Sequence, residues 1–523
     1  MNDLLISLMF IIAAGSPDAQ AIPGSELDTV STKTMAASVT VQGTGAAAGQ
    51  LPFWATAGHY GLMPESGGAL ALFQLRNDFD MEQRLQWRAG TSVALSCEAQ
   101  HLGSPQFMID ELYGSLRWKV LTLDAGCKRR AMDFCGADTS LGSLSVTGGH
   151  IVESGNARTM PGYNVSHAPV ALPYTGGKVR VWGEWGDYRT IDDRFVQGAL
   201  VHRTKLGLSC DIVPRLSFDF SLDHYAIWGG HHPEKKNIDV TIGNYLRVVT
   251  GRPAGADGNE PDRFNVIGDQ GGAETFALTW RGDGWKAELR HDIPYSDGSG
   301  MGFQNWPDGV NTLHFGFDRK DRWVSDVLYE YHYTMWQSGT VNGEIFDADG
   351  NSLTPPGVQT TGIDDYFNNY FYRSGWTHFG RPIGSPLLFP AGTRDGSWWD
   401  GAFGAAVANG KYGIENNRYK AHHIGLGGKL WRRHPYRLML TFSENYGTYR
   451  APYIGPSQIN QPWGTVHETG LSQFSAGFNG SITGLFSEKP SDSQLSLTYG
   501  IYYDRGELLP NNFGLSLGLR YTF

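Results

Sequence analysis

The last residues of the chain, 513–523, alternate strictly between apolar side chains and polar or small ones. Successive side chains of an extended strand point to opposite faces, so this pattern predicts a strand with one apolar and one polar face. The apolar set ends on the terminal residue itself. Its members are Phe513, Leu515, Leu517, Leu519, Tyr521 and Phe523, and the opposite set is Gly514, Ser516, Gly518, Arg520 and Thr522.

The same alternation recurs at 84–100, 215–223, 436–443 and 495–503. The composition suits an all-β chain, because aromatic residues make up 13%, glycines number 69 and charged residues are only 18%. Mean hydropathy is -0.32, and outside the N-terminus no apolar run approaches the roughly 20 residues of a spanning helix. If the chain spans a membrane, it does so with strands. A last strand that ends on Phe resembles the C-terminal signal of bacterial outer-membrane proteins.

Connections between the expected strands differ systematically in length. Short links lie at 281–284, 318–322 and 432–435, and long ones at 229–274, 291–311, 337–410 and 444–469. Transmembrane barrels have short periplasmic turns and long extracellular loops. With Phe523 on the periplasmic side, 484–494 becomes a periplasmic turn and 504–512 an outward link. The pattern predicts an all-β fold, a transmembrane antiparallel β-barrel of roughly 16 to 20 strands, with about 18 as the central value.

Three regions are expected along the chain. Residues 1–21 resemble a signal peptide, with an apolar stretch at 4–14 and the small-x-small site Ala19-Gln20-Ala21. Residues 22–50 are small and polar and are expected to form a periplasmic lead-in or a small plug-like element. Residues 51–523 are assigned to the outer-membrane barrel.

Charge and cysteine content restrict the partners and the chemistry. A net charge of -10 argues against a nucleic-acid partner, which would favour a basic surface. The four cysteines, Cys97, Cys127, Cys135 and Cys210, do not have metal-site spacing. A bridge between Cys127 and Cys135 and four unpaired thiols both remain open.

Aromatic, amide-rich and Gly-rich stretches stand between the strands, at 54–62, 156–164, 228–230, 368–376, 380–386 and 416–419. These stretches are similar to the Wzi family of capsule assembly proteins over nearly all of the mature chain, and most similar to its Bacteroidetes members. The resemblance implies an 18-stranded outer-membrane barrel with periplasmic helical material. It also implies a surface lectin that holds capsular polysaccharide at the cell exterior. It carries no individual ligand residue over to this chain.

Sugar recognition combines aromatic faces for the C–H side of a pyranose with planar polar groups for its hydroxyls. Three extracellular clusters have this character, and their members are Trp228, His231, His232, Asn305, Trp306, Trp398 and Trp399. The alternative is that these aromatic residues belong to the interfacial girdles of a barrel.

Four arginines could meet acidic sugar groups, because a guanidinium binds a carboxylate through two hydrogen bonds. They are Arg158, Arg373, Arg381 and Arg418. The alternative, which we favour, is that each pairs with Asp or Glu within the barrel.

Metal binding and catalysis are not expected. The neighbouring histidines at 231–232 and 422–423 should point to opposite faces of an extended chain and not chelate together. No local motif singles out a nucleophile with its base, and no cofactor is expected. The sequence therefore predicts a non-enzymatic outer-membrane protein that binds or organises surface polysaccharide, with outer-membrane lipid around it. The alternatives are a porin-like channel for oligosaccharides and an accessory subunit that has outer-membrane protein partners.

Overall fold

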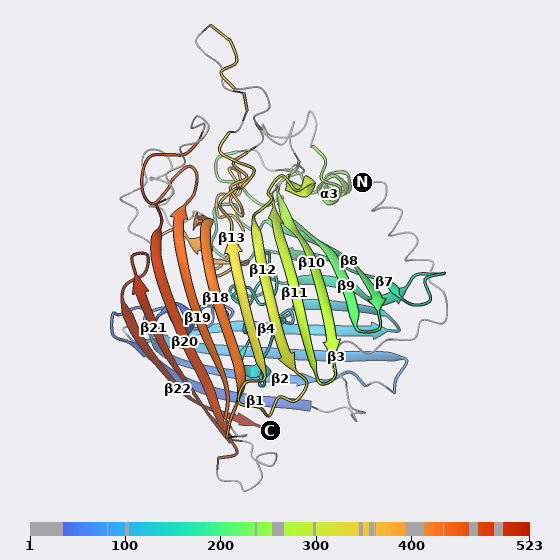
Figure 1. Ribbon diagram of the computed structural model, residues 1–523, viewed down its shortest axis with the longest axis vertical. Coiled ribbons are helices and arrows are strands. Elements are labelled where there is room, and N and C mark those ends of the chain that lie inside the picture. Colours follow the sequence, from blue (N-terminus) through green and yellow to red (C-terminus); the bar gives the residue numbers. More distant parts are fainter. Residues whose placement is uncertain are drawn as a thin grey trace.

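The computed structural model describes residues 35–80, 82–99, 104–235, 238–253, 266–296, 300–341, 343–344, 349–354, 360, 362–393, 413–431, 434–459, 469–485 and 495–523. Eighteen antiparallel strands form one closed barrel (Figure 1). Each strand pairs with its neighbour along the chain, and the last strand, β22, pairs with the first, β1. The fold class and the strand number expected from the sequence are confirmed.

The barrel strands, in chain order, are β1 Met35–Ala46, β2 Gly68–Asn77, β3 Leu85–Glu98, β4 Gln106–Trp118, β5 Leu121–Cys127, β6 Gly162–Ala171, β7 Val179–Arg189, β8 Leu200–Val213, β9 Leu216–Trp228, β10 Asp269–Gly282, β11 Trp285–Tyr295, β12 Gly309–Phe317, β13 Asp326–Tyr333, β18 Arg418–Leu430, β19 His434–Gly447, β20 Leu471–Thr483, β21 Leu495–Gly506 and β22 Asn512–Thr522. The connections contain helices α2 Phe53–Thr56 and α3 Ile242–Val249, and the strand pairs β14 Thr377–His378 with β15 Arg381–Pro382 and β16 Phe389–Pro390 with β17 Ile414–Asn416.

β1 corrects one boundary drawn from the sequence. It lies within residues 22–50, which were expected to form a periplasmic lead-in, so the barrel includes residues from Met35 onward. Its small side chains obscure the alternation, but its backbone pairs with β2 on one side and β22 on the other. Backbone pairing, and not burial of large apolar side chains, holds this strand in the sheet. The expected signal peptide, residues 1–21, lies outside the described residues.

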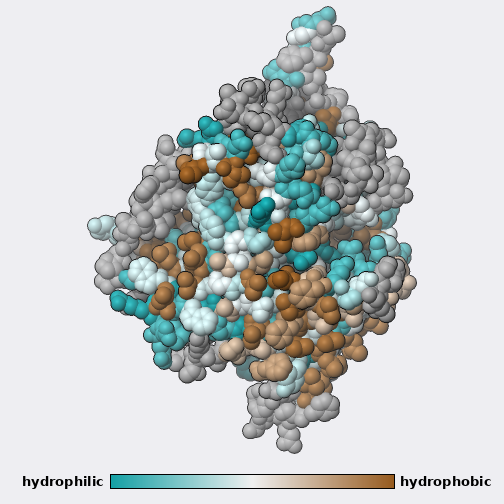
Figure 2. Space-filling view, turned by 180° about the vertical axis from the view of Figure 1, so that it is seen from behind, coloured by the Kyte–Doolittle hydropathy of each residue, from teal (hydrophilic) through white to brown (hydrophobic). Residues whose placement is uncertain are grey.

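The apolar face of the strands points outward. On β22, Leu515 and Leu517 are 50% and 60% exposed, whereas Asn512 and Ser516 of the alternate set are buried inside the barrel. Figure 2 shows apolar surface gathered over the lower part of the face seen from behind. This arrangement is the reverse of a soluble barrel and is typical of strands that face lipid. No described helix is long and apolar enough to span a membrane.

Link lengths separate the two ends of the barrel. The end that carries Met35 and Thr522, here called the terminal end, has short turns such as 214–215 and 283–284. The opposite end, the loop end, carries the connections 128–161, 229–268 and 334–417. The asymmetry expected from the sequence is confirmed, and the loop end is the one expected outside the cell.

Parts of these long connections fold back into the barrel and form an inward plug, which consists of residues 47–67, 128–161 and 362–390. Its apolar residues pack against the inner wall in one cluster that includes Trp54, Ile151, Trp376 and Leu388. The rings of Trp376 and Tyr225 of β9 stack with centroids 3.9 Å apart. The described filling of the lumen therefore comes from connections at the loop end, among them the link 47–67 between β1 and β2.

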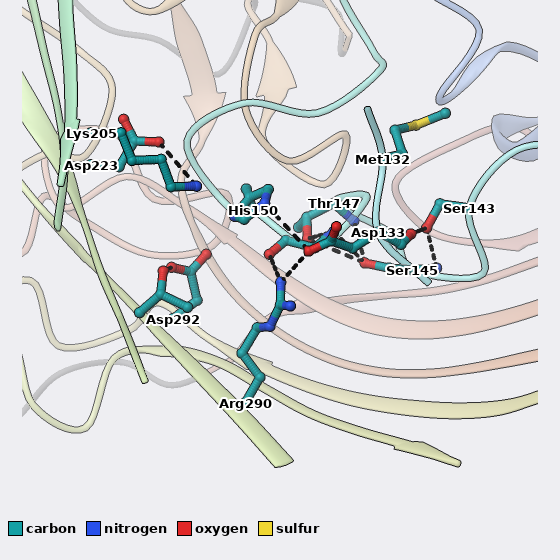
Figure 3. A network of polar contacts seen from close by, with 12 residues as sticks. Met132, Asp133, Ser143, Ser145, Thr147, His150, Lys205, Asp223, Arg290 and Asp292 are labelled. Atoms are coloured by element: carbon teal, nitrogen blue, oxygen red, sulfur yellow. Dashed lines mark hydrogen bonds and ion pairs between the residues drawn. The ribbon is translucent and has the colours of Figure 1, made fainter. Parts of the chain in front are cut away.

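Hydrogen bonds attach the plug to the inner side of strands β11 and β13. The Val146 N–H and the Ser145 hydroxyl donate to Glu330 of β13, and the Ile151 N–H donates to Asp292 of β11 at 2.7 Å. Figure 3 shows Asp133 of the plug beside Arg290 of β11, at 2.8 Å. These bonds satisfy polar groups that would otherwise be buried without partners.

None of the four cysteines, all of which the structure describes, forms a disulfide, so the alternative of a bridge between Cys127 and Cys135 does not hold.

Glu330→Ala should destabilise the plug, because the side chain is fully buried and its loss leaves the Ser145 hydroxyl and the Val146 N–H without this acceptor. Each buried donor left without an acceptor costs about 1–3 kcal/mol. We expect a lower midpoint of heat-induced unfolding, measured by circular dichroism in detergent. Glu82→Ala, at an exposed position in a terminal-end turn, is the matched control and should leave the midpoint unchanged. An unchanged midpoint for Glu330→Ala would show that these bonds do not hold the plug.

Candidate functional site: an aromatic and basic patch at the loop end

Three connections meet at the loop end and form an aromatic–basic patch, whose members are Phe195, His231, His232, Glu234, Lys235, Tyr370, Phe371 and Arg373. The His232 ring lies 5.1 Å from the Phe195 ring and 4.3 Å from the Phe371 ring. Both cations of the patch lie over rings. The Lys235 ammonium is 3.9 Å from the Tyr370 ring centroid, and the Arg373 guanidinium is 4.4 Å from that of Phe195.

Local hydrogen bonds explain why these segments adopt this shape. His232 Nδ1 accepts hydrogen bonds from the backbone N–H groups of Glu234 and Lys235, at 3.0 and 2.9 Å. Asn369 Oδ1 accepts from the N–H groups of Phe371 and Tyr372, an Asx turn that places Tyr370 at its tip. Each turn therefore fixes one half of the patch.

Backbone pairing then brings the connections together. His231 and Gln197 form a two-way bridge, with N–H···O distances of 2.9 and 3.0 Å. The Tyr372 hydroxyl donates to the Gly229 carbonyl at 3.2 Å. Gly229 has a φ of 63°, a left-handed conformation that favours glycine, where the chain leaves β9.

Exposure and charge make the patch suited to ligands. Tyr370 is 65% exposed, and the Lys235 hydrogen bond and charge lower the pKa of its phenol. His232 is buried, and burial lowers the pKa of its imidazole. Arg373 donates to Glu234 at 3.1 Å, so one carboxylate accompanies two cations. An exposed ring beside fixed cations can contact both the C–H face and the acidic groups of a sugar.

Of the residues expected to bind glycan, the structure brings His231, His232 and Arg373 into one patch. Trp228 is buried and packs on Tyr245 of α3, with ring centroids 5.9 Å apart. Asn305 is fully buried and donates to the Pro294 carbonyl at 3.0 Å. Both have structural roles away from the patch.

Trp306 is 60% exposed, and its ring lies 5.1 Å from that of His291 of β11. His291 shares the outward face of β11 with Leu289, so Trp306 lies against the outer wall. This position suits the interfacial-girdle alternative. Trp398 and Trp399 lie outside the described residues.

The other three arginines lie apart from the patch. Arg381 is 3.5 Å from Glu65, whereas Arg158 lies over the Phe379 ring at 3.8 Å. Arg418 is buried over the Tyr449 ring and donates to the Met335 carbonyl. Arg373 and Arg381 thus lie beside carboxylates, whereas Arg158, Arg373 and Arg418 lie over aromatic rings.

Five patch members were not expected from the sequence, namely Phe195, Glu234, Lys235, Tyr370 and Phe371. Tyr370 was noticed only as part of the stretch 368–376, and Lys235 follows the run His231-His232-Pro233-Glu234 that drew attention to metals. The two rings of the other histidine pair do separate: His422 contacts Tyr329 on the outer wall, and His423 contacts the Leu144 carbonyl inside. Among the described residues, no group of three His, Cys, Asp or Glu is placed to hold a metal ion.

A polar cavity of about 1010 Å³ lies in the lumen between the plug and the terminal-end residues Ala36 and Thr522. Eight of its lining residues are Lys or Arg and four are Asp or Glu. Most of these charges are paired, as in the contacts of Arg130 with Glu153 and Glu184, at 2.8 and 2.9 Å. The lumen thus contains a polar, charged cavity on the terminal-end side of the plug and is filled by the plug toward the loop end.

Comparison with solved structures gives matches along most of the chain. One is Wzi of Escherichia coli, an outer-membrane protein involved in group 1 capsule assembly and described as a carbohydrate-binding β-barrel. It is 12% identical, with 93% of this chain and 84% of Wzi covered and a TM-score of 0.52. OccK3 of Pseudomonas aeruginosa is 10% identical, with 94% and 95% covered and a TM-score of 0.43. The chain has the fold of an 18-stranded outer-membrane β-barrel.

The sequence itself matches no family model and no curated protein. The likeness to Wzi is therefore one of fold, and the Wzi resemblance seen in the sequence stays a prediction as to family.

Asp308 holds the start of the connection 334–417, which carries Tyr370. It accepts from the Trp336 and Gln337 N–H groups, at 2.8 and 2.7 Å, and from the Tyr366 hydroxyl. These bonds favour the carboxylate, but burial outweighs them and raises the pKa of Asp308 to about 7.

The folded chain therefore holds this proton more tightly than the unfolded chain does, and stability should fall as pH rises from about 4 to about 7. We expect Asp308→Asn to flatten this part of the pH dependence of the unfolding midpoint, measured by calorimetry in detergent. Identical profiles for wild type and Asp308→Asn would contradict the assignment.

Proposed function

We propose that this protein is a non-enzymatic outer-membrane barrel that binds or organises surface polysaccharide through the aromatic–basic patch. The observation that carries the proposal is the exposed Tyr370 ring. It stands at the tip of one turn, and the ammonium of Lys235, from another connection, lies over it. Such a ring offers a stacking face, and the neighbouring cations suit a polymer with acidic sugars.

Attachment of the patch segments to the plug supports a binding role. The patch segments are continuous with the plug, since Trp376 lies only a few residues after Arg373 and donates to the Val152 carbonyl at 2.6 Å. A surface fixed before the ligand arrives loses less conformational freedom on binding, which favours affinity. The fold likeness to a carbohydrate-binding barrel of capsule assembly agrees with this role.

The porin-like alternative is less well supported. The plug packs an apolar cluster across the lumen and bonds to β11, β13 and β19 on the far wall. A wide, permanently open pore would need these contacts to be absent or released. In planar bilayers, the purified protein should give no stable ion conductance at a level typical of open barrels, and a steady open-channel conductance would favour the channel.

Tyr370→Ala should weaken binding of the surface polysaccharide isolated from the producing cells, measured on immobilised polymer. Loss of one aromatic contact corresponds to about 0.5–1.5 kcal/mol, or roughly two- to tenfold in affinity. Lys235→Gln should reduce binding more at low salt than at high salt, because salt screens the attraction between the Lys235 charge and acidic sugars.

Tyr174→Ala is the matched control, since Tyr174 is a fully exposed tyrosine in the terminal-end turn between β6 and β7. It should bind like wild type. In cells, deletion of the protein should shift polysaccharide from the cell surface to the medium, seen by capsule staining and by assay of shed polymer. Equal binding by Tyr370→Ala and Tyr174→Ala would remove the patch from the proposal, and unchanged cell-associated polymer in the deletant would remove the function.

A further inference from the structure

A cluster of polar side chains lies on the outer wall of the barrel near the loop end. His202 of β8 has Nδ1 2.9 Å from Asp187 of β7 and Nε2 2.7 Å from the Thr204 hydroxyl. The Tyr163 hydroxyl of β6 donates to the same Asp187 at 2.6 Å. Their strand positions alternate with lumen-facing Glu184, Arg203 and Lys205, so the cluster points outward. Charged groups on a lipid-facing wall are costly unless they are paired or covered.

Helix α3 covers this cluster. The Tyr245 hydroxyl donates to Asp187 at 2.8 Å and accepts from Trp185 Nε1 at 3.0 Å. The His202 ring contacts the rings of both Trp185 and Tyr245, with centroids 4.6 and 5.5 Å away. One turn further along α3, Val248 is fully buried against Trp228 and its neighbours on the wall. Figure 1 shows α3 at the loop end, beside the ends of the strands.

Asp187, His202 and Thr204 have the order of contacts found in hydrolase triads. The setting does not suit that chemistry. β8 pairs with β7 and β9 on its two sides, so the backbone N–H groups around Thr204 are used within the sheet and cannot serve an oxyanion. The cluster acts instead as a polar attachment point for α3.

The remaining sides of α3 divide into an apolar one and a polar one. With 3.6 residues per turn, Ile242 and Leu246 lie roughly 60–100° around the helix from the wall-facing Tyr245. They are 81% and 56% exposed. Asn244 and Arg247 form the polar side of the helix, which faces away from the apolar pair. A helix with one side on the barrel, one apolar side and one polar side fits the corner between barrel, lipid and water.

We propose that α3 lies in the outer leaflet of the membrane, with Ile242 and Leu246 among lipid chains and Arg247 at the level of the anionic headgroups. α3 rests on the outward faces of β7 and β8, so its exposed apolar pair lies beside a wall that faces lipid, and lipid is the partner already present at this place. The aromatic residues Trp185, Trp228 and Tyr245 gather at the same level, as interfacial aromatics do. This inference does not depend on polysaccharide binding.

The test is the collision accessibility of nitroxide spin labels on the full-length protein in liposomes that contain anionic lipid. Single cysteines are placed at Leu246→Cys, Arg247→Cys and Leu289→Cys in a background with the four native cysteines replaced by Ala. Leu289, 57% exposed on the β11 wall, reports lipid. Arg247, the next residue on the same helix, reports water.

We expect a label at Leu246 to be more accessible to oxygen than to a water-soluble nickel complex, as at Leu289. A label at Arg247 should be more accessible to the nickel complex. A Leu246 label that matches Arg247 would place this side of α3 in water. A Leu246 label inaccessible to both reagents would mean that protein covers it. Either result overturns the proposal.

Tyr245→Phe tests the attachment without adding bulk. Loss of the hydroxyl leaves Asp187 and Trp185 Nε1 short of a partner. We expect a more mobile spectrum for a label at Leu246 and an unchanged one at Leu289. An unchanged spectrum at Leu246 would show that the cluster does not hold the helix.

Discussion

Closure of the sheet between β1 and β22 is the constraint on which the rest of this structure depends. No water is available in a bilayer to bond an unpaired strand edge, so only a sheet without edges is stable there. β1 meets this demand although its side chains are small, because its backbone is paired along both sides. Closure in turn places the apolar set of each strand outside and the polar set inside.

The polar interior creates a second demand, which the plug meets. Lumen charges such as Arg290 and Arg203 need counter-charges, and the plug supplies Asp133 to the first and Glu153 to the second. The plug needs the wall equally, since its Val146 and Ile151 N–H groups bond to Glu330 and Asp292. Wall and plug therefore stabilise each other. The described segments that carry the patch are thereby attached to the plug, and such attachment favours a surface that is preorganised for a ligand.

The features that the sequence predicts correctly are the local ones. Alternation and link length depend on neighbouring residues, and they suffice for the barrel, for a range of 16 to 20 strands and for the difference between an end with short turns and an end with long connections. Burial inside the barrel depends on segments far apart in the chain. Trp228 and Asn305 resemble exposed loop residues in sequence, yet α3 covers the first, and the second is enclosed near Pro294. For the same reason His231 and Arg373 could be chosen singly, whereas their meeting with Tyr370 and Lys235 could not be foreseen.

The outer-wall cluster shows why polar residues in a strand do not always mark the lumen. Asp187 and His202 occupy the outward set of β7 and β8, where alternation alone predicts apolar residues. They are tolerated because the chain returns to cover them with α3. The connection that does so, 229–268, begins with His231, His232 and Lys235 of the patch. One connection thus carries residues of the aromatic–basic patch and also supplies α3, which covers the outer-wall cluster.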